Sequence, residues 1–369
     1  MKIVLLSNLL GTKGKALASA QGIHLNPSNQ NFYQRIFESL KEIPGFLAIT
    51  FSTLTGIEDE PNEPLHYINR PTSKLKRWGY EQKVLKTVME KYGPLGKGDV
   101  LLYDALNVSF AHIASEFQKA GLKTIAICTD DPSNITGVPF LYPSVCKSAS
   151  QDANGYLCLT DGLNTLFNKH NRPFMKTLGI IEPTQKYPAP VEGPYLYFGG
   201  ALYDRYGVRA LVEAYEFSKL SIPLYIAGHG PLSEVLQAKN GKTLHFLGEI
   251  SKDKHLSYVS NATLCINPRC YDLGLDTVSV PSKVLEFLSN GKHILSTLST
   301  PIKETYPNAI NWIDGIDVQA ELIHFFAEHF DQEGLPQNLV ENTTQQQIQI
   351  DLGYTKFREN IVKFAKSLV

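Results

Sequence analysis

Three polar residues near the start of a short predicted helix have the types and spacing of a phosphate and polyol site. In SVPSKVLEFLSNGK, residues 279–292, Ser282 and Lys283 lie in the first turn and Glu286 one turn deeper. Free N–H groups at a helix start, with a lysine beside them, favour phosphate. Glu286 lies about 6 Å further along the axis, which suits a carboxylate accepting from both hydroxyls of a ribose. The alternative is a solvated helix face with one weak ion pair.

The position of this helix favours the first interpretation. Val284, Leu285 and Leu288 form its predicted core stripe, which leaves the three polar residues on a second face. The helix follows an apolar strand at 263–268, so its amino end is expected at the carboxyl edge of a sheet, where open α/β sheets bind ligands.

A second candidate lies in YFGGALYDRYGV, residues 197–208. Gly199 and Gly200 end a predicted strand and allow close backbone approach. Arg205 follows just before the next helix, and its planar fork suits the oxygens of a diphosphate. The alternative is an ordinary strand-to-helix turn with a surface arginine.

The first half of the chain offers weaker candidates. LLGTKGKAL, around Gly11, lacks the Walker A spacing, so we expect its glycines to let a substrate approach the first strand. Asp130, in TDDPSN, follows a strand and is a candidate general base, although a turn cap is an equally simple role. Asp104, at the end of the preceding strand, has the same two interpretations. The acidic EDE at 58–60 is expected in a surface loop.

Apolar strand-like runs alternate with amphipathic helical stretches along the whole chain, which predicts an α/β fold. The proline-rich segment 182–194 separates two such series. We therefore expect two doubly wound Rossmann-like domains, at 1–185 and 190–350, facing a central cleft. The C-terminal helix 352–369 is a candidate to complete the first. The predicted strands are 2–7, 46–51, 99–104, 124–130, 155–160, 195–200, 223–228, 244–249, 263–268 and 293–297; the predicted helices are 29–42, 76–92, 107–120, 208–219, 231–239, 252–260 and 281–290.

Composition narrows the class of protein. Of 369 residues, 43% are hydrophobic and 19% charged, which is typical of a globular chain. With a net charge of -1, the chain has no overall positive charge that would attract nucleic acid, and no nucleic-acid partner is expected. Five cysteines without a paired CxxC motif favour a reducing, cytoplasmic setting and no structural zinc. No run approaches the roughly 20 apolar residues that span a bilayer.

Four segments together resemble a known family. YLYFGGALYDRYGVRALVEAY, LYIAGHGPL, LHFLGEISKDKHLSYVSNATLCINPR and SVPSKVLEFLSNGKHILST resemble the nucleotide-binding half of GT-B glycosyltransferases. They are most similar to the bacterial family-four group that builds surface polysaccharides. The resemblance covers roughly residues 195–305, and the last two segments are its most specific part. The first half resembles the family only in its strand–helix layout.

The resemblance implies roles for single residues. Glu286 would bind the donor ribose, and the cations at the helix start would hold the diphosphate. Arg269 would line the donor pocket, and the backbone around Ile250 would meet the base. The implied donor-binding set is Gly200, Arg205, Ile250, Arg269, Ser282, Lys283 and Glu286.

The chain departs from the family pattern at two positions. Many members carry a second glutamate eight residues before the ribose-binding one, where this chain has Val278, with Asp276 nearby. Many also have an arginine directly after the glycine pair, where this chain has Ala201. Arg205 would therefore have to supply that positive charge.

The implied reaction transfers a sugar from a nucleoside diphosphate sugar to a hydroxyl. Lys283 and Arg205 would stabilise the leaving diphosphate without a metal or other cofactor. The family implies retention of configuration; if the enzyme inverts, Asp130 is the candidate base. Lys283, Arg205 and Asp130 are thus the catalytic candidates. Gly11, Asp104 and Asp130 are the acceptor-binding candidates.

The acceptor is expected to be a saccharide or a lipid-linked saccharide at the inner membrane face. The motive is NRPTSKLKRWGYEQK, residues 69–83, where five basic residues interleave with Trp78 and Tyr80, a composition suited to an anionic lipid surface. A solvated helix start explains the segment equally well. The alternative functions are a non-catalytic nucleotide-sugar or glycan-binding subunit and a GT-B-type epimerase or phosphorylase.

Overall fold

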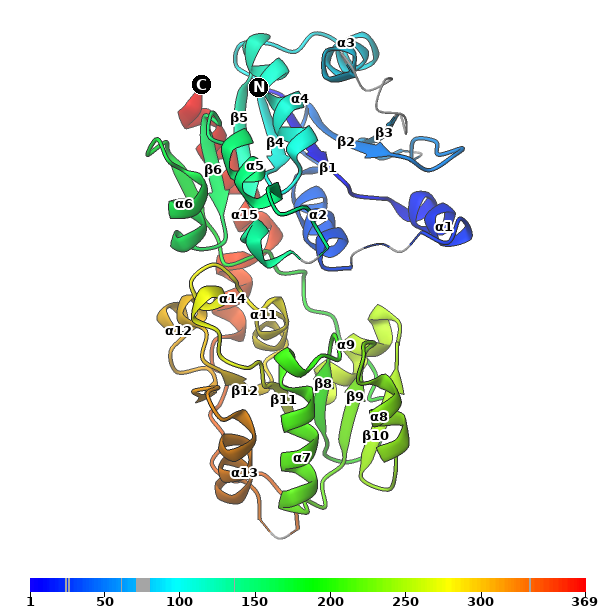
Figure 1. Ribbon diagram of the computed structural model, residues 1–369, viewed down its shortest axis with the longest axis vertical. Helices are drawn as coiled ribbons and strands as arrows, with labels where there is room; N and C mark the ends of the chain where they lie inside the picture. Colours follow the sequence, from blue (N-terminus) through cyan, green and yellow to red (C-terminus); the bar gives the residue numbers. More distant parts are fainter. Residues whose placement is uncertain (24, 26, 61, 71–79, 136, 332) are drawn as a thin grey trace. The chain divides into compact units, whose positions relative to one another are not determined.

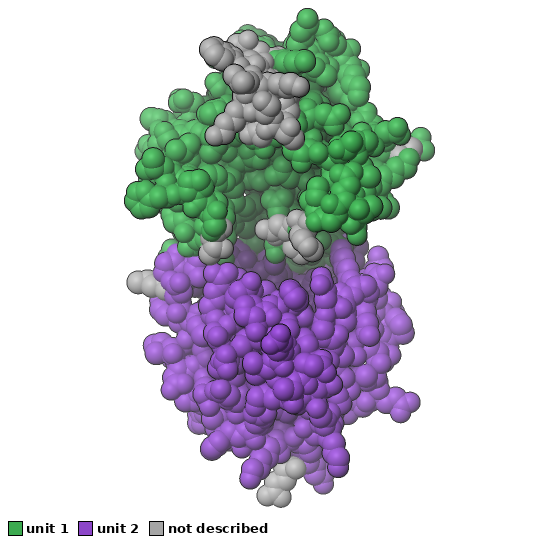
Figure 2. All heavy atoms as spheres, turned by 45° about the vertical axis from the view of Figure 1, so that its right-hand side comes forward, with its two compact units in different colours: residues 1–182, 277–279, 352–369 green, residues 183–276, 280–351 purple. Residues whose placement is uncertain are grey.

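The computed structural model describes residues 1–23, 25, 27–60, 62–70, 80–135, 137–331 and 333–369. The chain forms two compact units, which Figure 2 shows in two colours. The first unit contains residues 1–182, 277–279 and 352–369, and the second contains residues 183–276 and 280–351. The C-terminal segment therefore belongs to the first unit.

A parallel sheet of seven strands in the order β3-β2-β1-β4-β5-β6-β7 forms the centre of the first unit's described part (Figure 1). Every residue of β1 and β4 is buried, because helices cover both faces of a parallel sheet. The strands are β1 (Ile3–Ser7), β2 (Phe46–Ser52), β3 (Leu65–Asn69), β4 (Val100–Asp104), β5 (Lys123–Cys128), β6 (Gly155–Cys158) and β7 (Phe174–Lys176).

The helices of the first unit include a partner from the far end of the chain. α15 packs on α2, and its Phe357, Ile361 and Ala365 join the core formed by β1 and β4. Phe364 and Leu368 on the same helix are partly buried against that core. The helical segments are α1 (Thr12–Ala20), α2 (Pro27–Leu40), α3 (Tyr80–Tyr92), α4 (Val108–Lys119), η2 (Pro132–Asn134), α5 (Tyr142–Ala149), α6 (Asp161–Phe167) and α15 (Tyr354–Leu368).

The described part of the second unit contains a parallel sheet of six strands in the order β10-β9-β8-β11-β12-β13. α7 and α13 pack together and share the core of one sheet face, and α9 lies against β8. The strands are β8 (Leu196–Gly199), β9 (Leu224–Ala227), β10 (Leu244–Gly248), β11 (Leu264–Asn267), β12 (His293–Thr297) and β13 (Asn311–Ile313). The helical segments are η3 (Asp204–Tyr206), α7 (Val208–Ser218), α8 (Ser233–Lys239), α9 (Lys252–Asn261), α10 (Leu273–Asp276), α11 (Ser282–Ser289), α12 (Thr300–Thr305), α13 (Val318–His329) and α14 (Gln345–Leu352).

Each sheet has one topological switch point, where strand order reverses. In the first unit it lies between β1 and β4, and in the second between β8 and β11. Loops that leave two such strands diverge in opposite directions, and ligands of open α/β sheets bind in the crevice between them. Gly200 lies in the loop after β8, and Arg269 lies in the loop after β11. In the first unit, Gly11 lies after β1, and Asp104 is the last residue of β4.

The predicted α/β, doubly wound architecture is confirmed, and the predicted cleft stays a prediction. The sequence missed β3, β7 and β13, which lie at sheet edges, where apolar runs are short or alternate with half-exposed residues. Cys128, Cys158 and Cys265, which lie in apolar strands, are buried free thiols. No helix in the part of the chain that the structure describes combines the length and apolar character that crossing a bilayer requires.

Replacing Ile361 with alanine is expected to destabilise the first unit. The side chain is fully buried in a core built from both ends of the chain, and such a deletion costs about 2–5 kcal/mol. Urea denaturation of the full chain measures the change. Lys363→Ala, at an exposed position on the same helix, is the matched control and should change stability by less than about 0.5 kcal/mol. Equal effects of the two variants would contradict the docking of α15 in this core.

Candidate functional site

Gly200 leaves room for a lysine side chain at the switch point of the second unit. It follows β8 with φ 154°, and a Cβ built there would lie 2.1 Å from Nζ of Lys283. Lys283 is the second residue of α11. The amino end of that helix therefore lies at the carboxyl edge of the sheet, and Gly200 admits the lysine amine rather than only a ligand.

The charge of Lys283 is held in an unfavourable setting. Its Nζ lies 4.6 Å from the centre of the Phe198 ring and 5.8 Å from that of Tyr206. Burial, and then the positive charge of Arg269, lower the pKa of Lys283 to about 8, against a smaller opposing effect of Glu286. A diphosphate close to this amine would favour its charged form.

Arg205 lies close to the same aromatic ring as Lys283. Its guanidinium carbon is 4.9 Å from the Tyr206 ring centre and 5.6 Å from that of Tyr203. It also donates to the Tyr206 hydroxyl at 3.2 Å. Tyr206 therefore has two cations within 6 Å of its ring, a geometry that positions both through cation–π attraction.

Arg269 and Ser282 complete the polar groups around the start of α11. Arg269 follows β11, is half-buried, and is close enough to Lys283 to lower the pKa of its amine. Ser282 is exposed as the first residue of α11, and Pro281 before it gives the helix no side-chain cap.

Ile250 belongs to a series of touching loops. Gly228 N donates to Gly248 O at 2.8 Å, and a Cβ at Gly228 would lie 1.8 Å from Gly200 O. The loops after β8, β9 and β10 are therefore in contact, and half-buried Ile250 lies two residues beyond Gly248.

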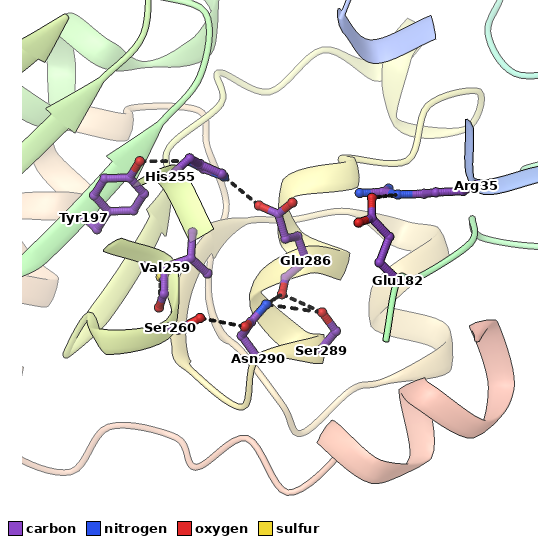
Figure 3. A network of polar contacts seen from close by, with 10 residues as sticks. Arg35, Glu182, Tyr197, His255, Val259, Ser260, Glu286, Ser289 and Asn290 are labelled. Atoms are coloured by element: carbon purple, nitrogen blue, oxygen red, sulfur yellow. Dashed lines mark hydrogen bonds and ion pairs between the residues drawn. The ribbon is translucent and has the colours of Figure 1, made fainter. Parts of the chain in front are cut away.

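Glu286 is held by a hydrogen-bond chain that the sequence did not reveal (Figure 3). His255 Nε2 lies 2.7 Å from Glu286 Oε1, and the hydroxyl of Tyr197 lies 2.8 Å from His255 Nδ1. The side chains of His255 and Glu286 are 22% and 18% exposed. The carboxylate is thus partly buried and oriented by a neighbour from α9.

The predicted core stripe of α11 is confirmed. Val284, Leu285 and Leu288 are buried, and Phe287, which lies outside the predicted stripe, is buried with them. Lys283 and Glu286 remain on the polar side of the same helix.

The acidic residue near the missing second glutamate has a local role. Asp276 accepts from the backbone N–H and the hydroxyl of Thr300, the first residue of α12. Val278 is buried. Asp276 thus caps a helix start.

In the first unit, Asp104 is buried at the end of β4, beside the switch point. Its carboxylate accepts from Leu106 N at 2.9 Å and from the Asn29 amide at 3.4 Å. Burial raises its pKa to about 6, although these donors oppose the shift. The side chain is 2% exposed and closes its own turn.

Asp130 follows β5 and also makes local hydrogen bonds. Its Oδ1 accepts from Asp131 N at 2.8 Å and from the Asn134 amide at 3.4 Å. Asp131 caps η2 by accepting from Ser133 N. The turn-capping role weighed for this segment is therefore present.

The expectation of a surface loop for the acidic triplet at 58–60 is wrong for Glu60. Its side chain is buried, and its Oε1 accepts from Lys13 N at 3.0 Å and Gly14 N at 3.2 Å. A Cβ at Gly11 would lie 2.5 Å from the same oxygen. Glu60 thus caps the start of α1, and the glycine makes room for it.

The predicted membrane-binding segment lies mostly outside the residues that the structure describes. Of the basic and aromatic segment 69–83, residues 71–79 lie outside the described residues. Within the described ranges, no three His, Cys, Asp or Glu side chains are grouped as ligands of a metal ion.

The chain is similar in fold to known glycosyltransferase structures. No known protein-family model matches it, and none of the curated proteins does. Sucrose-phosphate synthase from Thermosynechococcus elongatus aligns over 100% of this chain and 99% of its own, with a TM-score of 0.66 and 12% identity. HepE from Anabaena in complex with UDP and glucose aligns over the full length of both chains, with a TM-score of 0.67 and 12% identity.

A third structure extends the comparison. The lipopolysaccharide outer core galactosyltransferase WaaB aligns over the full length of both chains, with a TM-score of 0.65 and 13% identity. Together with the two parallel sheets, these full-length matches show that the chain has the GT-B fold.

Replacing Lys283 with methionine is expected to remove a pH dependence of stability. Because the folded pKa of about 8 is below the ordinary 10.5, the unfolded chain binds more protons between these values. Wild-type stability should therefore rise with pH in that window relative to the variant, and the lysine should be most destabilising below about pH 8. Melting temperatures of both proteins from pH 7 to 11 measure this, and a constant difference would contradict it.

Proposed function

We propose that the protein is a glycosyltransferase that moves a sugar from a nucleoside diphosphate sugar to a hydroxyl group. The observation that carries the proposal is the Lys283 amine, packed against Gly200 at the switch point, with Arg269 nearby and Glu286 one turn deeper. The GT-B fold and the UDP complexes of HepE support the same function.

Donor binding would use groups that are already in place. Lys283, Arg269 and Arg205 would neutralise the diphosphate at the start of α11, helped by the N–H groups of its first turn. Glu286 would accept from the ribose, and the backbone around Ile250 would meet the base. Ser282, exposed at the helix start, would donate its hydroxyl to a phosphate oxygen.

Catalysis would rest on the charge that develops as the anomeric bond breaks. Negative charge then accumulates on the leaving diphosphate, and preorganised cations stabilise it more than they stabilise the bound donor. Lys283 is the main candidate, because the attraction of a bound diphosphate would oppose the burial and the Arg269 charge that lower its pKa. These cations supply the needed charge without a metal or other cofactor.

Finer features of the proposal come from the family resemblance. The reaction would retain anomeric configuration, as in the family-four enzymes of surface-polysaccharide synthesis. The acceptor would be a saccharide or lipid-linked saccharide, bound by the first unit through the region of Gly11, Asp104 and Asp130. For an inverting reaction Asp130 would be the base, after releasing its bonds within the turn.

Replacing Glu286 with glutamine is expected to weaken ribonucleoside diphosphate binding. A hydrogen bond to a charged group contributes about 1.5–3 kcal/mol, which is roughly 10- to 100-fold in affinity. A thermal-shift and calorimetry screen of wild type and variant against UDP, GDP, ADP and CDP measures it. Glu304→Gln, at an exposed acidic position on α12 with no assigned role in binding, is the control. Unchanged affinity and turnover in Glu286→Gln would sink the assignment.

Turnover separates an enzyme from a binding subunit. Incubating the protein with the sugar nucleotides of each base that binds should release the diphosphate slowly by hydrolysis, and faster with an acceptor. Binding without any release would support the non-catalytic alternative. The anomeric proton of the product, observed by NMR, distinguishes retention from inversion, and EDTA should leave the rate unchanged.

Peripheral membrane association is a separate proposal that rests on the sequence of residues 69–83. The protein should co-sediment with anionic vesicles at low salt and dissociate as salt rises, because the attraction is screened. Replacing Lys74, Lys76 and Arg77 together with glutamine should abolish the association. Equal sedimentation with neutral vesicles would contradict it.

A further inference from the structure

The hydrogen-bond chain behind Glu286 points to a positioning residue for the nucleotide. We propose that His255 fixes the Glu286 carboxylate so that the pocket distinguishes ribose from 2′-deoxyribose. The inference rests on the proposed function, since it assumes that Glu286 meets the sugar of a nucleotide. It adds a specificity role for His255, on a helix that carries none of the predicted site residues.

The direction of each hydrogen bond follows from the groups involved. A carboxylate only accepts, so His255 Nε2 must carry the proton that is donated to Glu286 Oε1. In the neutral ring Nδ1 is then an acceptor, and the Tyr197 hydroxyl donates to it at 2.8 Å. Burial raises the pKa of Tyr197 well above its ordinary value, so this phenol keeps its proton. Tyr197 thereby selects the tautomer that donates to Glu286.

Packing fixes the far end of this chain. Tyr197 is fully buried and stacks on Tyr258, with ring centres 5.4 Å apart and an angle of 11° between the planes. Tyr258 and His255 both belong to α9, so one helix supplies the ring and its support. The imidazole is therefore held from its Nδ1 side before any ligand arrives.

Gly199 shows that the fold makes room for this imidazole. A Cβ at Gly199 would lie 2.7 Å from Cε1 and 2.8 Å from Nδ1 of His255. Tyr197 and Gly199 are two apart on β8 and face the same side of the sheet, toward α9. Gly199, the last residue of β8, and Gly200, directly after it, thus have separate roles, because Gly199 admits His255 and Gly200 admits Lys283.

A fixed carboxylate is more selective than a mobile one. Glutamate has three side-chain torsions, and ordering them on binding reduces the affinity gained from a new hydrogen bond. His255 engages Oε1 in advance, which limits the rotation of the carboxylate before a ligand arrives. The ribose 2′-hydroxyl then meets a prepared acceptor, and its removal leaves a partly buried charge without that partner.

The experiment compares each ribonucleotide with its 2′-deoxy analogue. Calorimetry with UDP, GDP, ADP and CDP and the four corresponding 2′-deoxynucleoside diphosphates gives an affinity ratio for every base that binds. We expect wild type to prefer the ribose form by on the order of tenfold or more. His255→Leu should reduce this ratio to within about threefold of unity. His255→Gln, whose amide can still donate to Glu286, should restore most of it.

Two further variants leave His255 itself unchanged. One displaces its ring, and the other removes the hydroxyl that donates to its Nδ1. Gly199→Ala places a methyl group against the imidazole and should lower the ratio as His255→Leu does. Tyr197→Phe keeps the ring stack, removes the donor to Nδ1, and should lower the ratio partially. Ser257→Ala is the matched control. It removes the hydrogen bond that Ser257 on α9 donates to Pro188 O, and it leaves the Tyr197–His255–Glu286 contacts in place. It should keep the wild-type ratio.

The outcomes separate the inference from the proposed function. The positioning role is overturned if wild type binds ribonucleotides and His255→Leu keeps the same preference for them over the 2′-deoxy forms. A variant that lowers the affinity for both forms equally would have this result. The same holds if His255→Gln behaves like His255→Leu. If the folded wild type binds none of the four ribonucleotides, the proposed function fails, and the role of His255 fails with it. A ratio lost in His255→Leu and Gly199→Ala and kept in Ser257→Ala supports the inference.

Discussion

The second unit depends on the close approach of a lysine amine to a strand end that has no side chain. Lys283 reaches over the Phe198 ring to Gly200, where any Cβ would collide with its Nζ. Burial and Arg269 both disfavour its positive charge, so the fold maintains a cation that an anion would stabilise. The surrounding features follow from that constraint: the glycine, the aromatic rings that flank the amine and the uncapped start of α11.

The reversal of strand order at β8 and β11 brings these groups together from distant parts of the sequence. Gly200 follows one strand, Arg269 follows the other, and α11 comes after both. The similar GT-B structures share this architecture at 12–13% identity, so the same fold occurs with mostly different side chains. A fold shared so widely does not specify a reaction, so any function depends on the particular residues of the site.

Periodicity and turn chemistry were sufficient to predict much of the molecule. The buried parallel strands read as continuous apolar runs, and the helix expected at 281–290 is α11, Ser282–Ser289. Edge strands such as β7 and β13 were missed because three residues carry no periodic pattern. The second unit begins at Pro183, inside the proline-rich segment 182–194.

Contacts between distant residues were beyond the reach of local patterns. His255 contacts Glu286, 31 residues away in the sequence, and Tyr197, 58 residues away, and no sequence motif predicts either pair. Glu60 reaches Lys13 N across 47 residues, and its neighbours in an acidic triplet indicated solvent instead. Both cases leave one signal in the sequence, a glycine opposite the approaching side chain, but its partner is visible only after folding.

The carboxylate of Glu60 makes the two halves of the molecule chemically unequal. Both units are parallel α/β sheets with a glycine near the first helix after their switch-point strand, a layout that in either half could attract a polyanion. In the first unit the protein supplies its own negative group to the amides of Lys13 and Gly14. A diphosphate would meet an acidic side chain there, whereas the second unit presents Lys283 and Arg269 beside its switch point.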